Sequence, residues 1–135
     1  AAYQRRFAQA LDDDPGGPFD VIICPACALP ALRHGASAEV VTSGAYATLY
    51  NVLGFPAGVV PVTQVRAGEE LAKRSRVDAM ERAATRTEQG SAGLPVGVQV
   101  VARPWREHVA LAAMRAIEEA VGPFPRPPEH ERTSP

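Results

Sequence analysis

Residues 51–62, NVLGFPAGVVPV, place two glycines and two prolines beside small and β-branched side chains. Glycine and proline usually mark a loop, whereas Val59, Val60 and Val62 are typical of a buried strand. A proline within a strand removes one N–H group from the ladder. Pro61 is therefore expected at a sheet edge, at a bulge or among the first residues of the strand. The segment predicts a rigid turn that leads from a helix straight into the core of a sheet.

The glycines and prolines of this segment have different roles. Gly54 and Gly58 lack a Cβ, so the backbone can pass close to a neighbouring element or adopt a positive φ there. Pro56 and Pro61 restrict φ and hold the angle at which the chain enters the strand. A tight helix-to-strand connection explains the same residues, and the two interpretations are compatible.

Hydrophobic periodicity predicts alternating helices and strands along the rest of the chain. The expected helices cover residues 3–11, 44–53, 76–86 and 107–121. The expected strands cover residues 19–24, 59–65 and 93–102. The first strand, FDVIIC, is a continuous apolar run of the kind that is buried on both faces of an α/β sheet. The alternation predicts an α/β layer architecture.

The sequence also predicts helix ends and faces. Thr42 or Ser43 is expected to cap the second helix, and Gly54 to end it. The third helix lies in a charged segment, residues 66–92, which we interpret as a solvated excursion. The apolar face of the last helix is expected to contain Leu111, Met114, Ile117 and Val121.

The composition is that of one globular domain, because 46% of the 135 residues are hydrophobic and 21% are charged. A net charge of −1 creates no broad field that would attract nucleic acid or an anionic membrane. No apolar run reaches the ~20 residues that a membrane helix needs, and no signal-peptide core is present. We therefore expect a cytoplasmic protein without a nucleic-acid partner, and we expect translation to begin upstream of residue 1. A membrane anchor outside this segment stays open.

Cys24 and Cys27 form a Cys-Pro-Ala-Cys motif directly after the first predicted strand. A CxxC pair at a helix N-terminus can be a thioredoxin-like redox site, but Pro30 argues against a long helix that starts at Cys27. One CxxC supplies only two zinc ligands, and His34, His108 and His130 show no metal-like spacing. The pair is interpreted first as two small buried hydrophobic residues, with a redox pair and a metal site as alternatives.

Several motifs, in order, resemble the C-terminal part of the amidase-signature family. They are Asp20 and Pro25 around the first strand, Asn51-x-x-Gly54-x-Pro56 with Pro61, GLPVGVQ at residues 93–99, and Glu107 with Glu118. Within this family, YATLYN at residues 46–51 and RPWRE at residues 103–107 are most similar to the fatty acid amide hydrolases. The resemblance covers roughly residues 3–122. Its specificity comes from the combination, since each motif alone would be weak.

The resemblance implies a fold and a domain organisation. Residues 1–122 would form the C-terminal portion of an α/β/α sandwich with a mixed sheet. Residues 123–135 would form a disordered, proline-rich tail. The remaining, N-terminal amidase portion would be the main partner, and homo-oligomerisation stays open.

The resemblance also implies hydrolysis of carboxamides, with a fatty acid amide or ester as a candidate small-molecule substrate. The family uses a nucleophilic serine, a bridging serine and a lysine, with backbone N–H groups as an oxyanion hole and without a cofactor or metal. Those residues lie N-terminal to the matched part, and this chain has no Gly-Gly-Ser-Ser-Gly-like run. Its single lysine, Lys73, lies in the charged excursion, and Ser43 and Ser91 are interpreted as a cap and a turn residue. We therefore expect no complete catalytic apparatus in this chain.

The remaining role is contact with substrate. Residue by residue, positions that line the acyl channel in fatty acid amide hydrolases fall on Val41, Gly44, Thr48 and Met80. Gly44 and Thr48 are one helical turn apart, as a channel wall requires. Here Gly44 replaces a branched residue, Thr48 is more polar, and Met80 stands where a large aromatic is expected. The differences predict a wider or differently shaped pocket.

Two other functions stay open as alternatives to a hydrolase segment that supplies scaffold and one wall of the substrate pocket. One is a non-catalytic α/β binding module that kept the scaffold without the chemistry. The other is a thioredoxin-like redox protein built on Cys24 and Cys27, which would also need a cis-proline packed on the pair.

Overall fold

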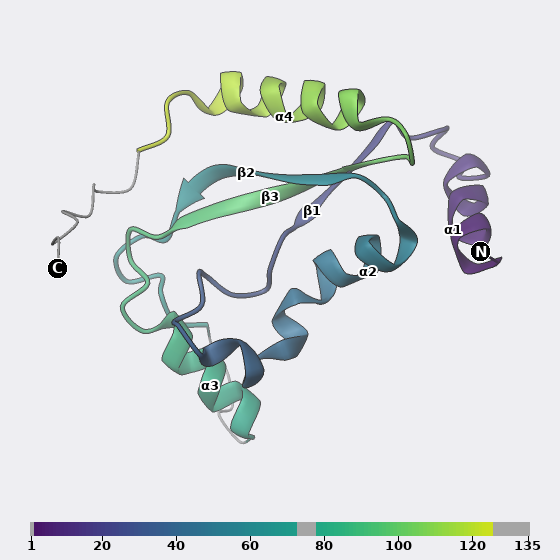
Figure 1. Ribbon diagram of the computed structural model, residues 1–135. Coiled ribbons are helices and arrows are strands. Elements are labelled where there is room, and N and C mark those ends of the chain that lie inside the picture. Colours follow the sequence, from purple (N-terminus) through teal and green to yellow (C-terminus); the bar gives the residue numbers. More distant parts are fainter. Residues whose placement is uncertain (1, 73–77, 126–135) are drawn as a thin grey trace, which may run out of the picture.

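The computed structural model describes residues 2–72 and 78–125, which form a small α/β unit (Figure 1). The helices are α1 (Ala2–Asp12), α2 (Ala45–Leu53), α3 (Ala79–Glu88) and α4 (Glu107–Val121). Two 3₁₀ turns, η1 (Ala36–Ala38) and η2 (Val41–Gly44), precede α2. The strands are β1 (Val21–Pro25), β2 (Ala57–Gln64) and β3 (Pro95–Ala102). The order of elements predicted from periodicity is confirmed, although most of the proposed tail lies outside the described residues.

The three strands form one sheet in the order β1-β3-β2, and both pairings are antiparallel. A mixed sheet was expected, so the sheet of the described residues differs from that expectation. The direction of β3 follows from the connection after β2. The Gly93 N–H donates to the Val65 carbonyl and the Val65 N–H to the Leu94 carbonyl, at 2.8 and 3.0 Å. The chain thus returns to the end of β2 that it left, and β3 must run antiparallel.

Pro61 lies where the sequence predicted it. β2 is an outer strand of the described sheet, and its register shifts between Pro61 and Thr63, which is a β-bulge. Pro61 faces Gly97 across the ladder. An edge position and a bulge both tolerate the missing N–H group, so the expectation is confirmed in both respects.

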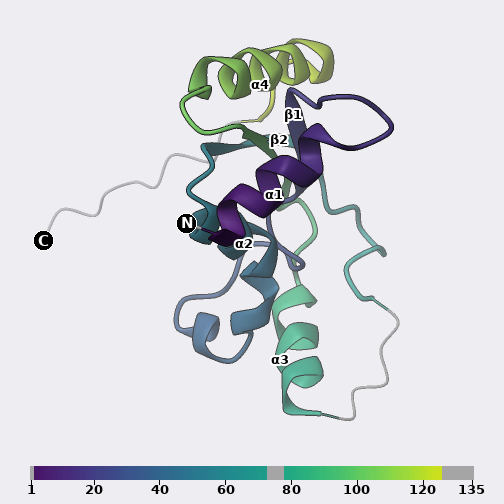
Figure 2. The same cartoon turned by 90° about the vertical axis from the view of Figure 1, so that its right-hand side faces the viewer.

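Helices cover the two faces of the sheet unequally. Figures 1 and 2 show α4 along one face, with α2 and α3 on the opposite side. On the α2 side, Tyr50, Leu53, Phe55 and Val101 form the main core. The Phe7 ring of α1 meets the Phe55 ring edge-on at 5.7 Å between centroids. This core packs α2 against the sheet.

The charged excursion is less solvated than predicted. Ala83 and Ala84 of α3 are buried against Val40 and form a second small core. The Glu88 side chain is buried too, and its Oε2 accepts the Ala72 N–H at 3.3 Å. The helix therefore has one buried face, and the prediction of a solvated excursion holds only for its other face.

Two predictions about buried faces were also wrong, in whole or in part. β1 is not buried on both faces, because α4 lies over β2 and β3 and leaves Ile23 56% exposed. In α4 the predicted face is only half right: Met114 and Ile117 are partly buried, but Leu111 and Val121 are exposed, and Ala110 is buried instead. The helix is rotated about its axis relative to the predicted apolar face.

The two glycines of the opening segment behave as expected, each for a different reason. Gly54 ends α2 with φ +68°, a left-handed conformation that other residues rarely adopt. A Cβ at Gly58 would lie 2.8 Å from the Met114 methyl carbon, so a side chain there would force the end of Met114 to shift. Because Gly58 has no Cβ, α4 can pack directly on β2 through Met114.

Candidate functional site

The four predicted pocket residues lie on the surface below the sheet. Val41 and Gly44 belong to η2, Thr48 to α2 and Met80 to α3. A contact of 3.1 Å between the Thr42 hydroxyl and the Met80 sulfur brings η2 and α3 together across 38 residues of sequence. Val41 and Met80 are 71% and 45% exposed, so these apolar side chains are available for contact.

Gly44 and Thr48 form one turn at the start of α2. The Thr48 hydroxyl donates to the Gly44 carbonyl at 3.1 Å. Because this bond occupies the hydroxyl proton, the methyl group is the part of Thr48 left for apolar contact. A Cβ at Gly44 would meet no atom within 4 Å, so the surface beside this residue is open.

Neither Thr42 nor Ser43 caps α2, contrary to the sequence prediction. Gly44 is the N-cap and makes no side-chain capping bond. The preceding 3₁₀ turn takes over the role, because the Ala45 N–H donates to the Thr42 carbonyl. Ser43 is buried instead, and its carbonyl accepts the Ala28 N–H at 2.9 Å.

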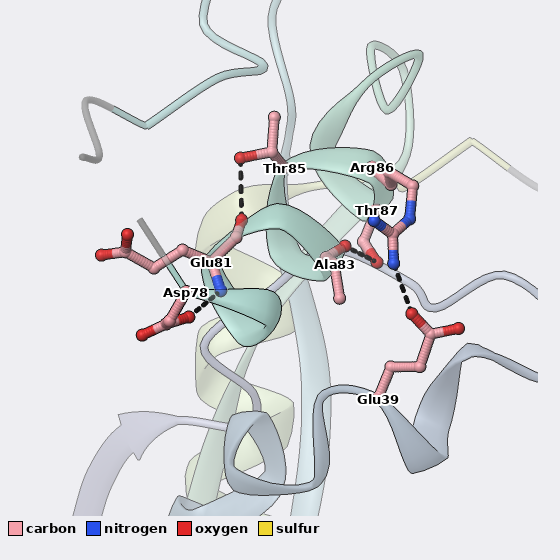
Figure 3. A network of polar contacts seen from close by, with 7 residues as sticks. All are labelled: Glu39, Asp78, Glu81, Ala83, Thr85, Arg86 and Thr87. Atoms are coloured by element: carbon pink, nitrogen blue, oxygen red, sulfur yellow. Dashed lines mark hydrogen bonds and ion pairs between the residues drawn. The ribbon is translucent and has the colours of Figure 1, made fainter. Parts of the chain in front are cut away.

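α3 is stabilised by local polar contacts, which Figure 3 shows. Asp78 caps the helix by accepting the Glu81 N–H at 2.7 Å. The Thr85 and Thr87 hydroxyls donate to carbonyls one turn back, at 2.9 and 3.1 Å. The spacing Asp78-x-x-Glu81 is the sequence signature of such a cap, which the sequence analysis did not use.

An ion pair joins α3 to the segment before η2. The Arg86 guanidinium binds the Glu39 carboxylate, and both side chains are more than half exposed. Exposed pairs of this kind contribute about 0–1 kcal/mol. The Asp78 cap and the buried Ala83 and Ala84 therefore do more to set the position of Met80.

Two open pockets of about 480 Å³ lie elsewhere. One is formed by residues 26–32 and the start of β3, residues 95–97. The other lies between α1, the end of α2 and Pro104. Neither includes the four predicted residues, so the structure leaves their role as a pocket wall a proposal.

The two cysteines are free and partly buried. The Cys24 sulfur lies 3.5 Å from the Gln99 side-chain nitrogen and 4.0 Å from the Tyr50 hydroxyl. Burial, and then the hydrogen bond with Cys24, raise the pKa of Tyr50 above its ordinary value. These contacts place Cys24 in the packing between β1, β3 and α2.

The redox interpretation lacks its structural basis. After Cys27 the described chain next becomes helical at η1, so no helix N-terminus stabilises a thiolate. The described residues contain no cis peptide bond, and so no cis-proline packs on the pair. In the same part of the chain, no three His, Cys, Asp or Glu side chains are grouped as metal ligands.

The structure describes the serines considered as catalytic candidates, but not the lysine. Ser91 is a turn residue, as predicted: its N–H donates to the Glu88 carbonyl and its carbonyl accepts the Leu94 N–H. Its side chain is only 1% exposed. Lys73 lies outside the described residues. Among the helices that the structure describes, none has the length and apolar character to cross a membrane.

Comparisons with known proteins extend over most of the chain. The amidase family profile matches residues 1–111. Fatty acid amide hydrolase 1 of Caenorhabditis elegans is 40% identical over 123 residues, which cover 89% of this chain and 21% of that enzyme. Fatty-acid amide hydrolase 1 of Sus scrofa is 39% identical over 113 residues, covering 81% of this chain and 19% of that enzyme.

A more distant relative has a different name. Acetamidase of Aspergillus oryzae is 31% identical over 115 residues, covering 82% of this chain and 20% of that protein. The chain thus spans about a fifth of the length of each of these three relatives.

Proposed function

The chain belongs to the amidase family, and we propose that it is a C-terminal segment of a serine hydrolase that cleaves carboxamide bonds. The observation that carries this proposal is the 40% identity with a fatty acid amide hydrolase over 89% of the chain. Fatty acid amides, or the related esters, are the proposed substrates. The two catalytic serines and the lysine would come from the part of the enzyme that the matched segment does not cover.

The proposed fold is the C-terminal portion of the α/β/α sandwich, over residues 1–122. Helices on both faces of the described sheet support it. A mixed sheet needs at least one parallel pairing, and both pairings here are antiparallel. The parallel strand would therefore be supplied by the remaining portion of the enzyme. The proline-rich residues 123–135 would be a tail outside this fold.

Within that enzyme, the chain would contribute scaffold and one wall of the substrate pocket. Val41, Gly44, Thr48 and Met80 are the proposed wall residues. The exposed side chains of Val41 and Met80, the engaged hydroxyl of Thr48 and the open surface at Gly44 support an apolar wall. An acyl chain in contact with it would gain about 0.8 kcal/mol per buried CH₂ group.

A chimera tests whether this chain supplies scaffold and pocket wall while the catalytic residues lie in the rest of the enzyme. This chain would replace the matching segment of the C. elegans enzyme, and hydrolysis of a long-chain fatty acid amide would be measured. We expect the chimera to be active, and the isolated chain and the enzyme truncated before the segment to be inactive. Lys73→Ala in the chimera should leave the rate within about twofold, because the proposed catalytic lysine lies elsewhere. Hydrolysis by the isolated chain, abolished by Lys73→Ala, would contradict the proposal.

A second prediction concerns the pocket wall. Gly44→Ile in the chimera restores a branched side chain, which adds apolar contact to a bound acyl chain. The ratio of kcat/KM for a long-chain fatty acid amide to that for acetamide should rise about tenfold, which corresponds to 1.4 kcal/mol. Ala112→Ile, an exposed position on α4, is the matched control and should leave the ratio unchanged. An equal effect of both substitutions would remove Gly44 from the proposed wall.

A further inference from the structure

The hydrogen-bond pattern of the sheet determines which backbone groups point outward. The Ala102 N–H donates to the Pro56 carbonyl at 3.0 Å, so Ala102 of β3 directs its polar groups toward β2. Alternate residues of a strand direct these groups to opposite sides. With the observed register, Val101 and Gln99 of β3 therefore bond to β1. On β1 itself, Val21 and Ile23 point their N–H and C=O groups away from the sheet.

The free edge of β1 lacks partners among the described residues. None of the backbone hydrogen bonds in the described turns and loops involves Val21 or Ile23. The Ile23 side chain is also 56% exposed on the face that α4 leaves uncovered. An exposed apolar edge strand with unpaired backbone groups is a site for pairing with another strand.

The free edge of β2 differs, although it has an apolar residue of similar exposure. By the same alternation, Ala57 and Val59 point their N–H groups outward, and Val59 is 54% exposed. Pro61, the next outward position, has no N–H group, and the bulge follows it directly. Proline and bulges are the features by which edge strands resist pairing. β1 has its proline only at its last residue, Pro25.

We propose that the free edge of β1 is where the sheet continues, by pairing with a strand from the remaining portion of the amidase chain. The inference rests on the proposed function and deepens it by locating the partner. The length of the relatives points to this occupant, because each of the three is about five times as long as the matched segment. That strand would bond to Val21 and Ile23, and its covering helix would bury Ile23 beside α4.

Hydrogen exchange tests the pairing without relying on activity. In the isolated chain, the Val21 and Ile23 amides should exchange rapidly. In the C. elegans chimera, both should exchange at least about a hundredfold more slowly, which is the protection of a ladder hydrogen bond. The outward amides of Ala57 and Val59 should exchange at similar rates in both proteins. A folded chimera in which Val21 and Ile23 remain as fast as in the isolated chain would overturn the inference.

A matched pair of substitutions gives a second readout. Ile23→Lys and Val59→Lys each place a charge at an exposed β-branched residue of an outer strand. Ile23→Lys should lower the yield of folded chimera at least tenfold, and Val59→Lys less than twofold. In the isolated chain, both variants should keep the parent's circular dichroism spectrum. Equal losses in the chimera, or a larger loss for Val59→Lys, would contradict the assignment of the edge.

The outcomes separate the inference from the proposed function. An active chimera with an unprotected β1 edge would refute only the inference, and a folded, inactive chimera with a protected edge would refute only the proposed function. A chimera that does not fold would refute both. Protection of Val21 and Ile23 in a dimer of the isolated chain would show that a second copy occupies the edge, against the inference.

Discussion

Leu53→Ala should lower the free energy of unfolding by about 2–5 kcal/mol, the range for large-to-small substitutions in a well-packed core. Leu53 is 2% exposed and packs with Tyr50, Phe55 and Val101 between α2 and the sheet. The cost has two parts: apolar surface is no longer buried, and the rigid surroundings leave a cavity. A domain of this size has a total stability of roughly 5–15 kcal/mol, so the variant would be close to unfolding.

The neighbouring residue provides the control for this prediction. Val52 lies in the same helix and is 64% exposed, so Val52→Ala should change stability by less than about 0.5 kcal/mol. Urea denaturation followed by circular dichroism would measure both variants. Trp105 is unsuitable as a fluorescent probe, because its side chain is 89% exposed in the folded state. Equal losses for the two variants would mean that α2 does not pack on the sheet through Leu53.

Gly97→Ala should destabilise the chain by about 1–3 kcal/mol, the usual cost of overpacking. A Cβ at this position would lie 2.7 Å from the Val59 Cγ1 atom and 3.0 Å from the Val60 carbonyl oxygen. The second contact is the more serious, since a backbone oxygen within a ladder cannot move without shifting β2. The φ angle of Gly97 is not in the left-handed region, so the effect would be steric.

Two variants isolate the steric cause. Gly44→Ala is the control, because a Cβ there meets nothing within 4 Å and the φ angle of −89° suits any residue. It should change stability by less than about 0.5 kcal/mol. Val59→Ala removes the Cγ1 atom, so the double variant Val59→Ala/Gly97→Ala should lose less than the sum of the two single variants. Additive losses would show that the contact with Val59 does not cause the destabilisation.

Gly97 also illustrates a limit of the sequence analysis. It was recognised only as part of GLPVGVQ, without a physical reason. Gly54 could be assigned its role from the sequence because the reason is local: a helix ends and the chain needs a positive φ. The reason for Gly97 lies on another strand, at Val59 and Val60, and depends on the register at the bulge.

The candidate site divides in the same way. Gly44 and Thr48 are one turn apart in sequence, and the hydrogen bond between them confirms that they form one turn. Met80 was predicted as a site residue only from the family resemblance. Its proximity to η2 appears only in the structure, through the contact with Thr42. Whether the four residues form a wall remains a proposal, because the opposite side of such a pocket would belong to the rest of the enzyme.

The amino-acid sequence by itself determined the order and type of the elements, the end of α2 at Gly54, the edge and bulge position of Pro61, and the family. These follow from periodicity, local backbone preferences and motif order, which are properties of neighbouring residues. Only the tertiary structure decided that β3 runs antiparallel to both neighbours, that Leu111 and Ile23 are exposed, and that Thr42 contacts Met80 instead of capping α2. Those outcomes depend on which distant segments meet in space, and no local pattern contains that information.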